Sequence, residues 1–337
     1  MKAYELRTEK DLKDFTALQV TDREQPHAGP GEVVVRVRAA SLNYRDLLVA
    51  KGASKRSAPL VPLSDGAGEI AEVGPGVKSV AVGDRVAGSF FQSWIAGEFQ
   101  EAHHASALGG AIDGVLAEYV RLRADAVVKL PGSISFEEGS TLPCAGLTAW
   151  NALFAAGAPL PGDTVLVEGT GGVSIFGLQF AKAAGARVVV TSSSDAKLDR
   201  ARSLGASTLI NYTKTPKWGE EARQITGGRG VDHVVEVGGA GTLNQALTAT
   251  RVGGAVSVIG VLTGFSGEVQ TSAILHKALR LRGIYVGSVE MFEAMVRAIE
   301  AHQIKPVIDR VFAFDEAQAA YAHLASGQHL GKVVISV

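Results

Sequence analysis

The chain has 337 residues, of which 46% are hydrophobic and 20% are charged, so it is long enough for two domains with sizeable cores. Its 33 basic and 34 acidic residues nearly cancel, and no segment approaches the roughly 20 apolar residues that span a bilayer. Cys144 is the single cysteine, which excludes an intrachain disulfide and a zinc site built from several thiolates. We expect a cytoplasmic protein that acts on a small molecule, not on nucleic acid or a membrane.

The first part of the sequence predicts β structure with many turns. Pro30 and Gly31 precede a stretch in which Val33, Val35 and Val37 recur at every second position, the pattern of a half-buried strand. Shorter apolar runs predict strands at residues 69–73, 82–87, 117–122 and 127–130. Residues 88–114 contain aromatic and histidine residues without a period, so we interpret them as a long loop that covers a pocket. Ser135 and Glu138 have capping-box spacing, which predicts a helix start, and a second helix is expected over residues 148–156.

The clearest functional signal is a glycine turn at residues 169–172, which read Gly-Thr-Gly-Gly. Apolar runs at 165–167 and 188–190 flank it as buried strands, and between them one helix face carries Val173, Phe176, Phe180 and Ala184. A turn without Cβ atoms lets a pyrophosphate approach the backbone, and the helix N-terminus offers free N–H groups. Ser174 stands where the dinucleotide motif has its third glycine, so the match is incomplete.

Strands and helices continue to alternate after this unit. Helices are expected at 195–204, closed by Gly205, and at 217–226 and 242–250, with strands at 208–210, 231–237, 255–259 and 282–286. This order predicts an α/β fold with a doubly wound parallel sheet. Beyond it, an apolar face at 289–302 predicts a core helix, a further helix starts near Asp315 and ends at Gly327, and a closing strand at 332–337 returns to the first domain.

Taken together, these segments resemble the medium-chain dehydrogenase/reductase superfamily, and in particular its zinc-free quinone-oxidoreductase-like branch, which is also called zinc-type alcohol dehydrogenase-like. The likeness covers essentially the whole chain and rests on short motifs in order: SLNYRDLL at 41–48, DGAGEIAEVG at 65–74, VGDRV at 82–86, CAGLTAW at 144–150, GTGGVS at 169–174, INY at 210–212 and GKVVI at 331–335. The resemblance implies a GroES-like catalytic domain at 1–125 and 290–337, interrupted by a Rossmann NAD(P)-binding domain at 126–289. It also implies a homodimer paired through the last Rossmann strand.

Relatives that use catalytic zinc hold it with residues matched here by Asn43, Ser64 and Cys144. One thiol without a second strong ligand does not reproduce such a site, so we predict no metal, with recruitment of His103 or His104 as the open alternative. We interpret Cys144 as a packing residue.

An NAD-preferring site needs a carboxylate after the second strand, where this chain has Thr191 followed by three serines. Hydroxyl and N–H groups there accept a 2′-phosphate, although Asp195 follows directly and could instead serve the helix N-terminus. NADPH-using zinc-free reductases resemble the chain further at Lys197 and Tyr212, which would contact that phosphate. We therefore predict NADPH, with NADH as the alternative.

The predicted cofactor residues are Thr148, Gly169, Gly171, Gly172, Val173, Ser192, Ser193, Lys197, Tyr212, Gly238, Gly260 and Val261. The catalytic candidates are Asn43, Tyr44, Ser64 and Asp65, whereas Arg45 and Asp46 are expected to form a structural ion pair. The resulting hypothesis is a zinc-independent oxidoreductase that reduces a quinone or an α,β-unsaturated carbonyl by hydride transfer. The alternatives are an alcohol or aldehyde dehydrogenase of the same superfamily and a non-catalytic NADPH-binding protein.

Overall fold

A computed structural model describes residues 1–7, 15–53, 59–155 and 157–337, so the expected helix end at Ala156 lies outside the described residues. The chain divides into two compact units, Met1–Leu147 with Val286–Val337, and Thr148–Tyr285. Residues 126–147 and 286–289 therefore pack with the first unit, whereas the sequence analysis placed them in the nucleotide-binding domain. Gly146 illustrates this packing, because a Cβ added to it would lie 3.3 Å from the sulfur of Met295 in the first unit.

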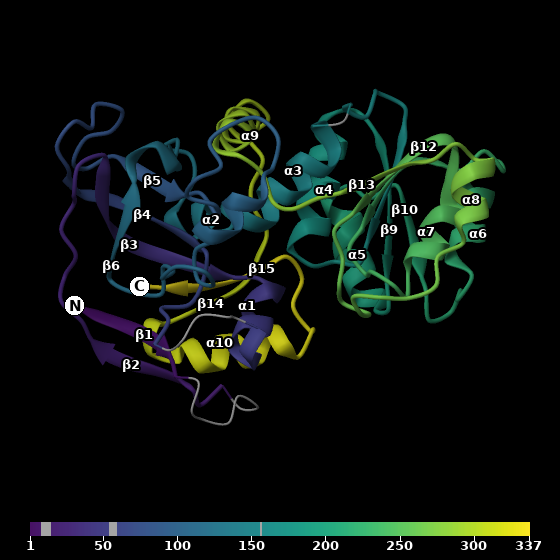
Figure 1. The fold of residues 1–337 in the computed structure, drawn as a ribbon. Coiled ribbons are helices and arrows are strands. Elements are labelled where there is room, and N and C mark those ends of the chain that lie inside the picture. The colour runs from purple at the N-terminus through teal and green to yellow at the C-terminus, as the bar shows by residue number, and fades with distance from the viewer. Residues whose placement is uncertain (8–14, 54–58, 156) are drawn as a thin grey trace. The chain divides into compact units, whose positions relative to one another are not determined.

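The first unit is built on a seven-stranded sheet in the order β14-β15-β3-β4-β5-β7, in which β6 pairs with β3 (Figure 1). Its strands are β3 (Glu32–Leu42), β4 (Asp65–Val73), β5 (Arg85–Gly88), β6 (Tyr119–Arg123), β7 (Val127–Lys129), β14 (Ile308–Phe312) and β15 (Lys332–Ser336). One edge of β3 pairs with β4, and its other edge pairs with β6 and then β15. The closing strand thus returns to the first domain, as predicted. The predicted alternation holds along much of β3, where Val35 and Val37 are buried and Arg36 between them is exposed, but Val34 is also fully buried.

Three strands of the first unit lack a strong sequence signal and were not predicted: β14, and the antiparallel pair β1 (Lys2–Leu6) and β2 (Leu18–Asp22). The capping box is confirmed, because Ser135 and Glu138 exchange hydrogen bonds at the start of α2 (Phe136–Ser140). The predicted core helix is α9 (Val289–Ala301), with Phe292 and Met295 fully buried. The remaining helical segments are α1 (Tyr44–Leu48), η1 (Val49–Ala53), η2 (Glu101–Ser106), η3 (Ala124–Ala126), η4 (Leu142–Gly146), η5 (Phe314–Glu316) and α10 (Ala317–Ala325).

Residues 88–114 form a packed aromatic cluster rather than an open loop. Phe91 is fully buried and lies within 5.1 Å of Phe99 between ring centroids, and the Trp94 ring stacks on His103 at 6.0 Å. The Val289 N–H, at the start of α9, also donates a hydrogen bond to the Trp94 carbonyl of this segment. Side-chain packing therefore holds the segment in place, with the short η2 as its helical part.

The second unit contains a six-stranded parallel sheet among its described residues, in the order β10-β9-β8-β11-β12-β13. The strands are β8 (Thr164–Glu168), β9 (Arg187–Ser192), β10 (Thr208–Asn211), β11 (Val231–Glu236), β12 (Thr250–Val258) and β13 (Arg280–Gly283). Numbered within this unit, the order is 3-2-1-4-5-6, that of a doubly wound dinucleotide-binding fold. The last strand lies two to three residues before the predicted 282–286, since its register is set by pairing with β12.

Helices cover both faces of this sheet. Figure 1 shows α4 (Gly172–Ala183) and α5 (Asp195–Leu204) on one side, and α6 (Trp218–Ile225), α7 (Leu243–Ala249) and α8 (Thr271–His276) on the other. The unit opens with α3 (Leu147–Phe154), and Gly205 ends α5 at a φ of 112°, as predicted. The predicted helix face on α4 holds for Phe176 and Phe180, which are buried. Across the described ranges, no helix combines the length and the apolarity that a bilayer crossing requires.

Candidate active site and cofactor site

The glycine turn joins β8 to α4 at the carboxyl edge of the sheet. Gly169 has a φ of 73°, and a Cβ added at Gly169 or Gly171 would meet no atom within 4 Å. No side chain among the described residues caps α4, so its first-turn N–H groups are available to an anion. The turn therefore has both the space and the donors that a pyrophosphate needs.

Ser174 departs from the glycine pattern because it has a structural bond of its own. Its hydroxyl donates a 2.5 Å hydrogen bond to the carbonyl of Glu168, which ties the first turn of α4 to the end of β8. Close helix-to-strand packing is provided three residues later, where a Cβ on Gly177 would lie 3.2 Å from Val167. Sequence reasoning missed Gly177 because it looked for that glycine only at the motif position.

The predicted phosphate-binding residues come from the ends of β9 and β10. Ser192 pairs with Asn211 in the register of these strands, and the Tyr212 N–H donates to the Ser192 carbonyl at 3.1 Å. Ser193 and Tyr212 are exposed, and Lys197 stands in the first turn of α5. The structure thus brings the predicted residues of this subsite to one edge of the sheet.

Two neighbouring side chains bind the Asp195 carboxylate, which makes it less available to a ribose hydroxyl. Its carboxylate accepts hydrogen bonds from Asn211 at 2.7 Å and from Lys214 at 2.5 Å, and these contacts lower its pKa. Asp195 is also the first residue of α5, where an acid is favourable. Lys214 was missed because no period or motif distinguishes it from a solvated lysine.

The other predicted cofactor residues follow β11 and β12. A Cβ on Gly260 would overlap the main chain of Val237, and the Gly260 N–H donates to the Glu236 carbonyl, so these two strand ends pack directly together. Gly238 is buried and Val261 is partly exposed beside them. Thr148, at the start of α3, is 4% exposed.

Two buried carboxyl groups lie beneath these turns, and sequence analysis had not singled them out. Glu168 ends β8 and Glu236 ends β11, and their side chains accept hydrogen bonds from the N–H groups of Gly238 and Gly239. The residues are 68 positions apart, so only the strand order of the sheet reveals that they meet.

Three of the catalytic candidates, Asn43, Ser64 and Asp65, belong to one buried polar network with Lys332. Its Nζ donates to the Leu42 carbonyl at 2.6 Å and to Asn43 Oδ1 at 2.5 Å. The Ser64 hydroxyl donates to one Asp65 oxygen at 2.6 Å, and the Cys144 N–H donates to the other at 3.0 Å. Adjacent strands cause this meeting, since β3 pairs with β4 and with β15 near its end.

Burial dominates the electrostatics of this network. It raises the pKa of Asp46 to about 6 against the opposing effect of Arg45, and it raises the pKa of Asp65 although Lys332 and Ser64 act in the other direction. The pKa of Lys332 is lowered by burial, which the two carboxylates oppose. Burial and Asp65 also raise the pKa of the Cys144 thiol, so it stays protonated and is no nucleophile at neutral pH.

Asn43 is the member of this network with spare hydrogen-bonding capacity. It is 8% exposed, and its buried Nδ2 makes no hydrogen bond of good geometry among the described residues, but its N–H acts as a donor toward Asp65 and lowers the pKa of that carboxyl. Because Lys332 occupies Oδ1, the amide presents its N–H groups. Asn43 is therefore a hydrogen-bond donor at this site.

Tyr44 and Arg45 are neighbours in α1 but have different surroundings. Tyr44 is 41% exposed. Arg45 binds the Leu108 and Gly109 carbonyls and pairs with Asp46 at 3.2 Å, which confirms the structural ion pair. Arg45 thus connects α1 to residues 88–114, which contain the aromatic cluster.

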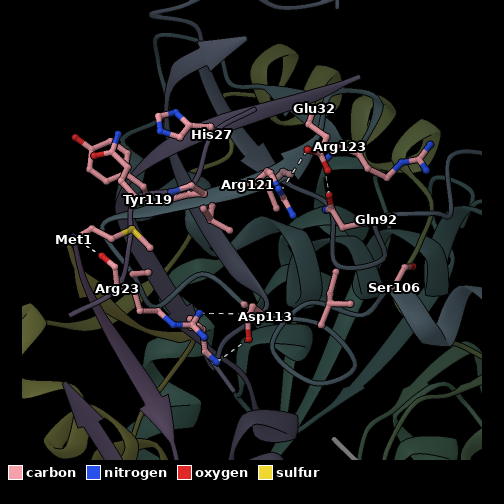
Figure 2. Close-up of a pocket in the computed structure, with 18 of the residues that line it drawn as sticks. Met1, Arg23, His27, Glu32, Gln92, Ser106, Asp113, Tyr119, Arg121 and Arg123 are labelled. Atoms are coloured by element: carbon pink, nitrogen blue, oxygen red, sulfur yellow. Dashed lines mark hydrogen bonds and ion pairs between the residues drawn. The ribbon is translucent and has the colours of Figure 1, made fainter. Parts of the chain in front are cut away.

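A separate groove of about 940 Å³ lies along β6 (Figure 2). Two of its arginines pair with carboxylates of the same groove: Arg23 bonds Asp113 at 3.0 Å, and Arg121 lies 3.4 Å from Glu32. The described residues that line it do not include Asn43, Ser64, Asp65 or Cys144. This groove is therefore not the candidate active site.

Family models match both parts of this architecture. Residues 29–132 match the alcohol dehydrogenase GroES-like domain, and residues 172–301 match the domain described as zinc-binding dehydrogenase. The chain belongs to the medium-chain dehydrogenase/reductase superfamily. A protein of this superfamily with this organisation is an oxidoreductase resembling the alcohol dehydrogenases.

Individual members of the superfamily are similar over nearly the whole length. A zinc-type alcohol dehydrogenase-like protein from Schizosaccharomyces pombe is 46% identical over 97% of each chain. The structure of a putative alcohol dehydrogenase from Sinorhizobium meliloti has 43% identity and a TM-score of 0.92, covering 100% of this chain and 99% of the other. An NAD-dependent alcohol dehydrogenase structure has 34% identity and a TM-score of 0.90, with 100% of both chains covered.

The superfamily implies a zinc ion, but the residues at the matched positions do not fit one. Asn43 and Ser64 are weak neutral donors, Cys144 keeps its proton, and the Lys332 ammonium already binds the Asn43 oxygen. The alternative ligands lie elsewhere: His103 bonds Ser93 at 3.0 Å and stacks on Trp94. Within the described ranges, no three His, Cys, Asp or Glu residues gather as a metal site.

Proposed function

We propose that the protein is an NADPH-dependent, zinc-independent reductase of quinones or α,β-unsaturated carbonyls. The observation that supports it most directly is the Lys332–Asn43 hydrogen bond at the place where zinc-using relatives have ligands. A buried ammonium there repels a divalent cation and supplies positive charge itself. Carbonyl polarisation then depends on hydrogen-bond donors of the chain.

Bound NADPH would supply the hydride, and the chain must stabilise the negative charge that develops on the substrate oxygen. Asn43 is suited to this task, because its Nδ2 lacks a partner among the described residues and Lys332 polarises the amide from behind. Tyr44 is exposed and is the candidate proton donor. Ser64 already donates its proton to Asp65, so its oxygen serves as an acceptor.

The proposed preference for NADPH rests on the end of β9. Ser192, Ser193 and Tyr212 supply hydroxyl groups, and the one nearby carboxylate, Asp195, is bound to Asn211 and Lys214. A 2′-phosphate would therefore meet donors and Lys197. NADH is the second candidate, because one similar structure is that of an NAD-dependent enzyme.

Alcohol or aldehyde dehydrogenation is the alternative activity, favoured by the names of the similar proteins. The deciding experiment supplies the purified protein with NADPH or NADH, a panel of quinones, enones and aldehydes, and identifies each product. A saturated ketone from an enone supports the proposal, and an allylic alcohol supports the alternative. Metal analysis of the same sample tests zinc independence, since stoichiometric zinc required for turnover would refute it. Cofactor binding without turnover on any substrate would indicate a non-catalytic protein.

We also propose a homodimer paired through β13. This strand bonds only β12 among the described strands, and Leu281 and Tyr285 near its free edge are 37% and 51% exposed. An edge strand with exposed apolar side chains favours pairing with a second copy.

A further inference from the structure

The buried carboxyl pair Glu168 and Glu236 has an unusual hydrogen-bond arrangement. The two residues are 4% and 0% exposed. Glu168 Oε2 accepts the Gly238 N–H at 3.2 Å, and Glu236 Oε1 accepts the Gly239 N–H at 2.6 Å and the Thr242 hydroxyl. Each carboxyl group thereby uses one oxygen.

The remaining oxygens, Glu168 Oε1 and Glu236 Oε2, find no donor among the described residues. Val167 and Val235 are partners in the parallel pairing of β8 with β11, which places the next residues, Glu168 and Glu236, side by side where their carboxyl groups interact. Two ionised carboxylates in a buried site repel strongly, whereas one proton between them lets one group donate to the other. A shared proton satisfies both leftover oxygens at once.

We propose that Glu168 and Glu236 hold one proton between them and thereby form a pH-sensitive link between the two turns of the cofactor site. Glu168 directly precedes the glycine turn at 169–172, and Glu236 holds Gly239 through its side chain and Gly260 through its carbonyl. The pair thus joins three of the strand ends that carry predicted cofactor residues, those of β8, β11 and β12.

Among the described residues that act on this carboxyl pair, none carries a positive charge that would offset the charge of the carboxylates. Burial is the largest cause of the raised pKa of Glu168, and the charge and the hydrogen bond of Glu236 raise it further. The Gly238 N–H and Thr242 lower it. Adjacent strands end in Thr191 and Ser192 on β9 and Val258 on β12, and α4 presents Gly172 and Ser174, none of which titrates. On β11 itself, His233 has its pKa lowered to about 4, so it is neutral, and Asp232 is paired with Arg229 and Arg251.

The pH dependence follows from the direction of the shift. The folded protein binds this proton more tightly than the unfolded chain, so the stabilisation is complete below the ordinary pKa of glutamate and declines as the pH rises through the raised pKa. Because the pair links the turns, affinity for NADPH should fall over the same range, by at most about tenfold per pH unit for one linked proton. The affinity effect rests on the proposed function, whereas the shared proton does not.

The direct test is infrared spectroscopy of the wild-type protein with ¹³C-labelled glutamate, which separates these carboxyls from Asp46 and Asp65. We expect a protonated glutamate carbonyl signal at pH 7 that is absent in Glu168→Gln and retained in the matched surface variant Glu268→Gln. The amide in Glu168→Gln is neutral and can still donate to Glu236, so this variant should fold and lose the pH dependence of its urea midpoint. If Glu168→Gln does not fold, the labelled wild type alone decides.

Absence of the protonated signal at pH 7 would overturn the proposal. A fall in stability on adding EDTA would also overturn it, because it would show a cation between the two carboxylates. If the signal is present but NADPH and NADH fail to bind at any pH, the shared proton stands and the proposed function fails.

Discussion

Lys332 donates a 2.5 Å hydrogen bond to Asn43 Oδ1, although 289 positions separate the two residues in the sequence. The contact forms because β15, which begins at Lys332, pairs with the end of β3 just before Asn43. It is the central contact of the candidate catalytic network.

Replacing Lys332 with methionine keeps most of the length of the unbranched side chain and removes its charge. Asp65 and Asp46 would then lose a buried cation, so we expect the free energy of unfolding in urea to fall by about 3–5 kcal/mol. The double variant Lys332→Met with Asp65→Asn should recover part of that loss. Equal stability of Lys332→Met and wild type would contradict the network.

Asn43→Ala tests the proposed donor to the substrate oxygen. Loss of one such donor should lower kcat by about 100- to 1000-fold, while the dissociation constant of NADPH changes little. Steady-state kinetics and fluorescence titration measure the two effects. Tyr44→Phe is the companion variant, because it removes only the exposed hydroxyl. If Asn43→Ala turns over as fast as wild type, another group stabilises the oxyanion.

Lys197→Ala tests the expected phosphate contact on α5. Loss of a hydrogen bond to a charged group costs about 1.5–3 kcal/mol, so the KM for NADPH should rise about 10- to 100-fold while the KM for NADH stays nearly constant. Lys78→Ala is the matched control, since Lys78 is an exposed lysine of the first unit. Equal effects on both cofactors would argue against 2′-phosphate recognition.

Gly171→Ala separates binding from folding at the glycine turn. The added methyl group meets no protein atom within 4 Å and the φ of −75° suits alanine, so the melting temperature should stay within about 2 °C of wild type. A pyrophosphate close to the backbone would clash with the methyl group, and cofactor affinity should fall at least about tenfold. Unchanged affinity would place the cofactor elsewhere.

Leu281→Asp tests the proposed dimer. A carboxylate on the free edge of β13 should disfavour strand pairing, so light scattering coupled to size exclusion should show a shift from two subunits to one. Wild type that is already monomeric at micromolar concentration would refute the dimer itself.

Local signals explain which elements could be predicted. In the second unit, β8 and β11 are buried along their whole length and contain apolar runs, and the Ser135 capping box marks a helix start within four residues. By contrast, β1, β2 and β14 are short and mix polar with apolar residues, so no local pattern predicts them. The aromatic cluster around Phe91 likewise has no period because its contacts are set by tertiary packing.

The candidate site divides in the same way. Asn43, Ser64, Asp65 and the glycine turn stand in motifs and were predicted. Lys332 lies inside a quoted motif without any signal of its role, and the Glu168–Glu236 pair depends on the strand order β8-β11. Such meetings of distant residues follow from topology and cannot be obtained from spacing along the chain.

The position of β15 in the first sheet also has a consequence for synthesis of the protein. Residues 148–285 are contiguous, so the second unit has all its strands once they have left the ribosome. The first unit must wait for β14 and β15, because β15 lies between β14 and β3. Until then the edge of β3 beside Leu42 is unpaired, and Asn43 lacks its lysine. The network around Lys332 therefore forms only after the C-terminal strand has been synthesised.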